Sequence, residues 1–381
     1  MHWLIAPDSL KDSLSSEELC KIAKQVIHDT YPNDRVSLYS MADGGEGSLA
    51  AISSMRKQRI KLKEIPTKSA IGEDIKGTIG ILDDQIAIIE LAEASGLQKV
   101  PHTKRCPFET TTYGTGLLIK AALNLGIREI VLFLGGSATN DCGLGIIAAL
   151  GGRFLDEHGK EIPYQGPRDI FSICSVNLQN LEPKLEDTNI KIACDVTNPL
   201  LGINGATKTF ARQKGAKTNE LEILETAMKK TKDLLTRDAK PCMQENHPGM
   251  GAAGGSPFGI AAITKPTIVP GFKLLAEITG LKHVINNDSI DIVITAEGKI
   301  DKQTGQGKLI SGLLELTKLR EIPTIALAGQ LEGDYQALYK SGLTAAFSIA
   351  NKPMSTEESI RLAPQLVREK IQNLVRLIKA I

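Results

Sequence analysis

The chain has 381 residues, of which 42% are hydrophobic and 23% charged, as in an ordinary globular protein. Its net charge of +1 argues against the basic surface by which proteins bind nucleic acid or an anionic membrane. The length exceeds that of most single-core domains, so we expect two domains.

Targeting signals are not evident in this sequence. Residues 1–8 have no basic segment followed by a long apolar run, so they do not resemble a signal peptide. No apolar run approaches the roughly 20 residues that span a bilayer. The six cysteines are scattered, without paired or zinc-type spacing, which is typical of free thiols. We therefore expect a cytoplasmic protein.

The first residues predict alternating strands and helices. Trp3–Ala6 is a short apolar run and predicts a strand. Ser15, followed three residues later by Glu18, predicts a helix N-cap, and apolar residues then recur at helical spacing. Val36–Tyr39 predicts a second strand, and another helix begins at Ser48.

The middle of the chain has a different pattern. Residues 60–95 alternate like antiparallel strands, with Asp83 and Asp84 as a turn. A helix over 115–125, a strand over 130–134 and a helix beginning at 144–150 follow. We expect this part to form a second α/β domain.

The C-terminal part returns to the first pattern. Strands are predicted at Asp291–Thr295, Thr324–Ala328 and Ala345–Ile349, with helices over 309–320, 332–341 and 356–380. Apolar strands that alternate with amphipathic helices predict a parallel sheet covered on both faces. We expect a Rossmann-like α/β domain formed by residues 1–65 and 285–381. The second α/β domain, residues 66–284, is inserted into it.

Several polar residues follow the predicted strands of the first domain. Asp8, Ser9 and Lys11 come after the first strand, where open α/β sheets bind ligands. Lys11 could neutralise a carboxylate or phosphate, and Asp8 could accept a proton or bind a metal. Asp43 precedes a glycine-rich turn that could bind hydroxyls or Mg²⁺. The alternative is that these residues form turns and helix caps.

The segment from Gly135 to Gly143 is the most specific signal in the sequence. A buried strand ends here in Gly135, Gly136 and Ser137, followed by Asn140 and Asp141. Bare backbone N–H groups and short polar side chains at a strand end bind anions and hydroxyls. A long glycine-rich connection is the alternative. The segment lacks the Gly-Lys-Ser/Thr of a Walker A loop.

Further candidates lie later in the chain. Asp195 follows the apolar residues 190–193 and could be a general base, a Mg²⁺ ligand or a cap. Lys214 belongs to a basic, glycine-containing loop suited to a polyphosphate, or merely solvated. Glu297 and Asp301 could bind a metal, and Lys308 near a helix N-terminus could meet a phosphate.

The types of these residues restrict the chemistry. None of the six histidines falls in these segments, which argues against a Ser-His-Asp triad and against imidazole-based metal chemistry. The remaining groups are carboxylates, a few cations, hydroxyls and backbone donors. This set fits phosphoryl transfer, in which catalysis is mostly positioning and charge neutralisation with Mg²⁺.

Taken together, the motifs resemble the bacterial glycerate kinase family that phosphorylates the 2-hydroxyl of glycerate. The matching segments occur in the family's order over nearly the whole chain: IAPDSLKDSLS (5–15), MADGGEG (41–47), TTTYGTGLLIKAAL (110–123), GGSATND (135–141), ACDVTNPL (193–200), RQKGA (212–216), GAAGG (251–255) and EGKIDKQTGQGK (297–308).

The resemblance implies two α/β domains around a cleft, ATP with Mg²⁺ as donor, and D-glycerate as acceptor. The active-site candidates it implies are Asp8, Ser9, Lys11, Asp43, Gly135, Gly136, Ser137, Asn140, Asp141, Asp195, Glu297 and Asp301.

We assign hypothetical roles to these groups on this basis. Lys11 would hold the carboxylate of the acid, and Asp195 or Asp43 would accept the hydroxyl proton. Glu297, Asp301 or Asp141 would hold Mg²⁺. Lys308 and Lys214, with the backbone of 135–137, would stabilise phosphate charge, and Asp8, Ser9, Ser137 and Asn140 would contact the substrate.

Two other functions are considered. A dehydrogenase using NAD(P) would need GxGxxG after the first strand, where the chain has APDSLKDS. A non-catalytic sugar-acid-binding protein would not need so many carboxylates. Neither nucleic acid nor a membrane is expected as a partner, and the protein is expected to be a monomer or a homodimer.

Overall fold

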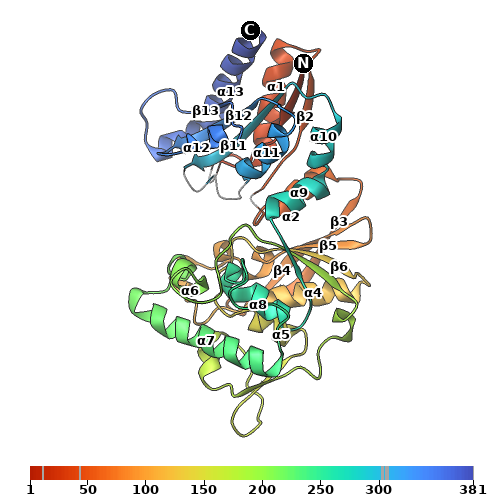
Figure 1. The fold of residues 1–381 in the computed structure, drawn as a ribbon, viewed down its shortest axis with the longest axis vertical. Helices are drawn as coiled ribbons and strands as arrows, with labels where there is room; N and C mark the ends of the chain where they lie inside the picture. The colour runs from red at the N-terminus through yellow and green to blue at the C-terminus, as the bar shows by residue number, and fades with distance from the viewer. Residues whose placement is uncertain (11–12, 43, 302–303, 305–308, 381) are drawn as a thin grey trace. The chain divides into compact units, whose positions relative to one another are not determined.

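The computed structural model describes residues 1–10, 13–42, 44–301, 304 and 309–380 (Figure 1). The chain forms two compact units. Unit 1 comprises Met1–Lys57 and Gly271–Ile381, and unit 2 comprises Gln58–Pro270. The predicted fold class is confirmed: both ends of the chain build one parallel-sheet unit, and a second α/β unit is inserted between them.

The bounds of the inserted unit differ from residues 66 and 284. It begins at Gln58, because strand β3 (Ile60–Lys68) pairs along its whole length with β4 (Asp74–Leu82). It ends at Pro270, because helix α9 (Gly271–Thr279) packs against α2 (Ser48–Met55) and α11 (Leu309–Lys318) of unit 1.

Unit 1 contains a five-stranded parallel sheet. Its strands are ordered β13 (Ala345–Ser348), β12 (Thr324–Leu331), β11 (Ile292–Ile300), β1 (His2–Ile5) and β2 (Arg35–Leu38). The chain moves outward from β1 to β2 on one side and from β11 to β13 on the other. The strand order therefore reverses between β1 and β11, and such a switch point is where open sheets bind ligands.

Helices pack on this sheet. Helices α1 (Ser16–Thr30) and α13 (Thr356–Ala380) lie side by side and bury the face that carries Trp3 and Ile5 (Figure 1). Helix α11 packs against β11 and β12, and α10 (Leu281–Asn287) packs on α9 and α11. The predicted capping box at Ser15 is present.

The helix predicted over 332–341 is shorter than expected. Only α12 (Ala337–Lys340) forms. Gly333 has a φ of 51°, in the left-handed region, and the Tyr335 N–H bonds back to the Gly333 carbonyl. The chain therefore turns before α12 can begin.

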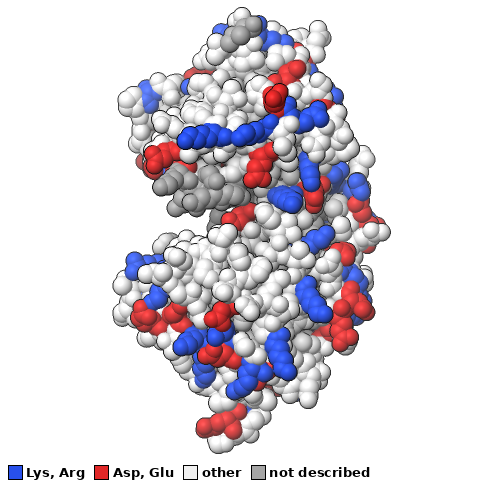
Figure 2. All heavy atoms as spheres, viewed as in Figure 1, with Lys and Arg blue, Asp and Glu red and all other residues white. Residues whose placement is uncertain are grey.

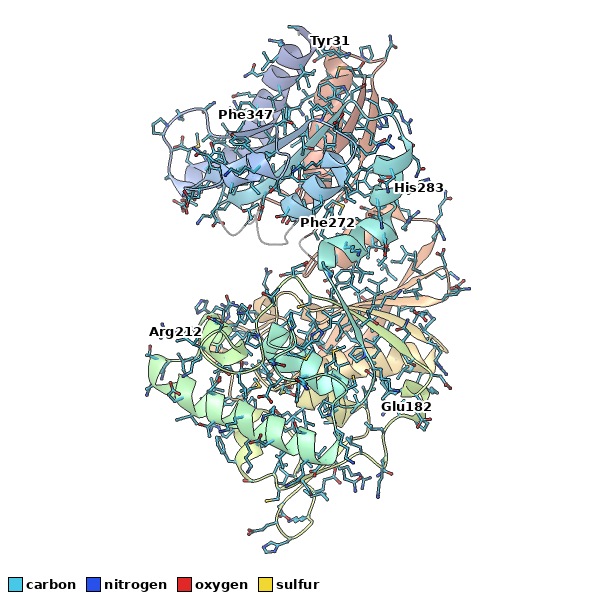
Figure 3. The ribbon with its side chains drawn as sticks, in the orientation of Figure 1. Tyr31, Glu182, Arg212, Phe272, His283 and Phe347 are labelled. Atoms are coloured by element: carbon cyan, nitrogen blue, oxygen red, sulfur yellow. The ribbon has the colours of Figure 1, made fainter. Side chains whose placement is uncertain are left out.

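A buried carboxylate ties the two ends of the chain together in unit 1. Asp34 accepts hydrogen bonds from the N-terminal amine at 2.9 Å, from Trp3 Nε1 at 2.8 Å and from Lys379 Nζ at 2.9 Å. Lys379 Nζ also lies 4.5 Å from the centre of the Tyr31 ring (Tyr31 is labelled in Figure 3). Burial acts to raise the pKa of Asp34, but these hydrogen bonds outweigh it and lower the pKa to about 2.

Unit 2 contains a six-stranded mixed sheet. Its order is β10 (Thr267–Val269), β9 (Asn189–Ala193), β6 (Glu129–Phe133), β5 (Ile86–Glu90), β4 and β3. The first four strands are parallel, and β5, β4 and β3 are antiparallel neighbours. The predicted turn at Asp83 and Asp84 joins β4 to β5, and both residues have the positive φ of a tight hairpin turn.

Helices also pack on this sheet. Helix α4 (Tyr113–Asn124) and α5 (Leu144–Ala149) bury apolar side chains against it, together with α3 (Ala92–Ser95) and α8 (Ser256–Ala261). Helix α7 (Leu221–Asp238) contributes to a second apolar cluster, and α6 (Ala206–Phe210) packs on α7. A two-stranded sheet, β7 (Arg153–Leu155) with β8 (Ser175–Asn177), completes the unit.

The surface carries charges of both signs. Lys and Arg alternate with Asp and Glu over the face drawn in Figure 2. Within the described residues, no helix has both the length and the apolar character needed to cross a membrane.

Candidate active site

The loop that follows β6 presents backbone donors at the edge of the unit 2 sheet. Among the described residues, none accepts a hydrogen bond from the N–H groups of Gly135, Gly136 or Ser137. Gly136 has a φ of 76°, a left-handed conformation that glycine adopts without strain. A backbone hydrogen bond anchors the loop: the N–H of Leu97 donates to the carbonyl of Gly136 at 2.7 Å. Consecutive unused N–H groups of this kind form a site for an anion.

A buried lysine supports this loop. Lys214 Nζ donates to Ser137 Oγ at 2.9 Å and to the carbonyl of Thr139 at 2.7 Å. Its side chain is buried, so Lys214 is not a solvated residue of a basic loop; its neighbour Arg212, labelled in Figure 3, is exposed. Burial lowers the pKa of Lys214 to about 7, opposed by the nearby charge of Asp141.

The carboxylate of Asp141 is enclosed by donors. It accepts five hydrogen bonds: two from Thr112 and one each from Thr111, Gly143 and Gly145. Burial raises the pKa of Asp141, and the hydrogen bonds from Thr112, Gly145 and Gly143 oppose this. Asp141 therefore joins the starts of α4 and α5 to the loop after β6.

Asn140 is buried beside the same loop. Its Nδ2 donates to Thr207 Oγ1 at 3.2 Å, whereas its Oδ1 has no partner among the described residues. The glycine-rich segment 249–255 packs directly behind it, since a Cβ on Gly254 would lie 2.1 Å from the Thr139 carbonyl. The glycine at 254 thus permits close packing on the loop.

Asp195 lies at the same edge of the sheet. Phe133 of β6 pairs with Ala193 of β9, and Gly135 and Asp195 each stand two residues beyond this pair. Neighbouring strands are about 4.8 Å apart, so the segments that follow β6 and β9 begin side by side. Asp195 is partly exposed.

In unit 1, the structure brings Asp8, Ser9 and Glu297 to the switch point of the sheet. The backbone N–H of Asp8 donates to the carbonyl of Ala296 at 2.8 Å, which places Asp8 beside Glu297 across the β1–β11 boundary. Asp8 Oδ1 accepts from Ser9 N at 2.6 Å. Both residues are partly exposed, although one oxygen of the Glu297 carboxylate, Oε2, is buried.

Asp301 comes four residues after Glu297 and directly follows the last residue of β11. Four residues of extended chain span about 13 Å, and β11 pairs regularly with β12 from Glu297 to Ile300. Asp301 Oδ2 lies 3.5 Å from Lys299 Nζ. This separation of Glu297 from Asp301 argues against a single ion bound directly by both carboxylates.

Three predicted residues, Lys11, Asp43 and Lys308, lie outside the described residues. Within the described residues, no group of three or more His, Cys, Asp or Glu side chains could hold a metal ion. Mg²⁺ is commonly held by one or two carboxylates together with substrate phosphates, so the carboxylate of Glu297 fits it.

Sequence reasoning missed the residues that hold Asp141 in place. Thr111 and Thr112 belong to the segment TTTYGTG, which the family resemblance included without a role. The same segment explains why residue 145 is a glycine: a Cβ at Gly145 would lie 2.2 Å from Thr111 Oγ1. The sequence signal for this contact is the run of three threonines, residues 110–112, directly before α4.

Comparison with known proteins identifies relatives along the whole chain. The model of the glycerate kinase family matches residues 3–379. A glycerate kinase of Bacillus cereus is 36% identical over 376 residues, 98% of this chain and 97% of the relative. A glycerate 2-kinase of Escherichia coli is 34% identical over 362 residues, 95% and 93% of the two chains.

A solved structure agrees with these matches. The protein from Salmonella typhimurium LT2, provisionally assigned as glycerate kinase 2, is 34% identical and superposes with a TM-score of 0.83. The alignment covers 100% of this chain and 98% of that one. The chain therefore belongs to the glycerate kinase family.

Proposed function

We propose that this protein is an ATP-dependent glycerate 2-kinase, which transfers the γ-phosphoryl group of ATP to glycerate and forms 2-phosphoglycerate and ADP. The family membership and the glycerate 2-kinase of E. coli support this reaction. The observation that carries the proposal is in unit 2. Three backbone N–H groups without a described acceptor follow β6, and Asp195 follows the neighbouring strand β9.

In this proposal, each element of the unit 2 edge has a role in the transfer. A bond forms between the 2-hydroxyl oxygen of glycerate and the γ-phosphorus, and the bond from that phosphorus to the β–γ bridging oxygen breaks. The carboxylate of Asp195 accepts the hydroxyl proton. The N–H groups of 135–137 stabilise the negative charge on the phosphoryl oxygens.

The remaining candidate groups have the roles predicted from the sequence. Glu297 would hold Mg²⁺, which when bound neutralises charge on the nucleotide phosphates. Asp141 is a weaker candidate for this ion because its oxygens already accept five hydrogen bonds. The ammonium of Lys11 would hold the glycerate carboxylate, Lys308 would meet a phosphate, and Asp43 is the second candidate base. Asp8, Ser9 and Asn140 would contact glycerate hydroxyls.

The two alternative functions receive no support from these relatives. The matched family and the named relatives are kinases, not oxidoreductases or non-catalytic binding proteins. All six cysteines are free thiols, which agrees with the cytoplasmic location that we propose.

The test is a direct assay of the purified protein. Incubation with MgATP and D-glycerate should form a phosphomonoester visible by phosphorus NMR. Enolase added without a phosphoglycerate mutase should then convert the product, because enolase uses the 2-phospho isomer. A product that enolase consumes only after mutase is added would be the 3-phospho isomer and would contradict the proposed regiochemistry. Absence of ADP formation would contradict the activity itself.

A further inference from the structure

The contact between Lys214 and Ser137 determines what the serine hydroxyl can do. Lys214 belongs to the short 3₁₀ helix Arg212–Lys214, and Ser137 to the loop after β6. Ser137 Oγ accepts from Lys214 Nζ at 2.9 Å. In its ammonium form Lys214 has donors only, two of which meet Ser137 Oγ and the Thr139 carbonyl, so the serine proton points to another acceptor.

The described residues offer this proton one poor acceptor. The Thr139 carbonyl lies 3.5 Å from Ser137 Oγ, whereas hydroxyl hydrogen bonds are commonly about 2.5 to 3.0 Å long. The same carbonyl already accepts from Lys214 at 2.7 Å. The Ser137 hydroxyl is thus available to an acceptor that the described residues do not supply.

The surroundings of this hydroxyl favour a negatively charged acceptor. The N–H groups of Gly135, Gly136 and Ser137 have no described acceptor either, so the loop presents donors. Lys214, a residue that is 3% exposed, adds an amine next to Ser137 Oγ. The charge of the nearby Asp141 carboxylate acts to raise the pKa of Lys214. The Asp141 oxygens accept hydrogen bonds from Thr111, Thr112, Gly143 and Gly145, and not from Ser137.

We propose that Lys214 is a positioning residue that directs the Ser137 hydroxyl, as a hydrogen-bond donor, to an anionic oxygen of a substrate. The inference deepens the proposed function and rests on it. It differs from direct phosphate binding by Lys214, because the lysine acts through the serine. The anionic oxygen belongs to the nucleotide phosphate or to the carboxylate of the acid, and the experiment separates these sources.

The test is a double-mutant cycle with Ser137→Ala, Lys214→Met and the double variant. Lys217→Met is the control, because Lys217 is an exposed lysine three residues after Lys214. The KM for ATP, the KM for D-glycerate and kcat are measured for each, with thermal unfolding to verify folding. Each single variant should lower kcat/KM by about ten- to a hundredfold. The double variant should lose no more than the worse single one, since residues acting as a unit are not additive.

The affected substrate identifies the ligand. A higher KM for ATP alone assigns the hydroxyl to a phosphate oxygen, and a higher KM for D-glycerate alone assigns it to the carboxylate. The inference is overturned if Ser137→Ala behaves like the original protein, or if the losses of the two single variants multiply in the double one. If Lys214→Met does not fold, Ser137→Ala alone decides.

Calorimetric titration with ATP and with D-glycerate separates this inference from the proposed function. A protein without turnover whose binding of either compound is weakened by Ser137→Ala would contradict the kinase activity and support the role of Ser137. Normal turnover with an unaffected Ser137→Ala variant would contradict the role of Ser137 alone. Failure of the original protein to bind either compound would contradict both.

Discussion

The carboxylate of Asp141 lies 2.7 Å from the backbone nitrogen of Thr112 and 2.9 Å from its hydroxyl oxygen. Thr112 directly precedes α4, and the N–H of Gly145 in the first turn of α5 donates to the same carboxylate oxygen. A negative charge is stabilised at the N-termini of helices. One side chain thereby aligns two helices with the loop of the candidate site.

Replacing this carboxylate should therefore destabilise the protein. Asp141→Ala leaves several buried donors without an acceptor, each costing about 1 to 3 kcal/mol, so we expect a loss of about 3 kcal/mol or more in urea unfolding. Asp156→Ala is the control, because Asp156 also accepts backbone hydrogen bonds but in an exposed turn, and its loss should be much smaller. Equal losses for the two variants would refute the structural role of Asp141.

Asp195 should be needed for turnover rather than for folding. Asp195→Asn removes the proposed proton acceptor, and kcat should fall by about 10² to 10⁴-fold. The melting temperature should change little, since the side chain is partly exposed. Asp187→Asn is a matched control. Asp187 is exposed and lies before β9, at the opposite end of the strand from Asp195. An Asp195→Asn variant with normal kcat would show that another group accepts the hydroxyl proton.

Glu297 should affect the requirement for Mg²⁺. Glu297→Gln keeps the size of the side chain and removes the charge that attracts the ion. The Mg²⁺ concentration for half-maximal activity should rise by about tenfold or more, a loss typical even of outer groups of a metal site. Glu315→Gln, on the exposed face of α11, is the control. If both variants need the same Mg²⁺ concentration, Glu297 is not a ligand.

The stability of the protein should depend on Asp34 in a defined pH range. Its pKa is about 2 in the folded protein against an ordinary 3.8, so the carboxylate stabilises the fold above pH 4 by at most about 2 kcal/mol. This contribution is lost as pH falls from about 4 to about 2. The difference in unfolding free energy between the original protein and Asp34→Asn should shrink over that interval. If the difference in unfolding free energy stays constant with pH, the charge of Asp34 is not the origin of the stabilisation.

The elements that depend on local patterns could be predicted from the sequence. The strand predicted over 130–134 is β6 at Glu129–Phe133, and the helix predicted over 356–380 is α13. Apolar runs and helical periodicity lie within each segment, so no distant contact is needed to recognise them. The glycine and aspartate positions after β6 and β9 were recognisable for the same reason.

Features that depend on distant contacts could not be predicted. From the sequence Lys214 could bind a polyphosphate or be solvated, and only the fold brings it to Ser137, 77 residues earlier in the chain. Asp141 resembles a metal ligand until Thr111 and Thr112, about 30 residues before it, are seen to enclose it. The limits of the inserted unit likewise follow from the pairing of β3 and the packing of α9, which local patterns do not specify.

The order of the strands in unit 1 has a consequence for biosynthesis. Trp3 pairs with Ile292, so a ribosome that adds about 5 to 20 residues per second completes β1 roughly 15 to 60 s before its neighbour β11. Strands β3 to β10 are synthesised during that interval, so the inserted segment can fold while β1 and β2 still lack the other three strands of their sheet. A chaperone that shields early apolar edges would therefore act on residues 1–57 rather than on the inserted segment.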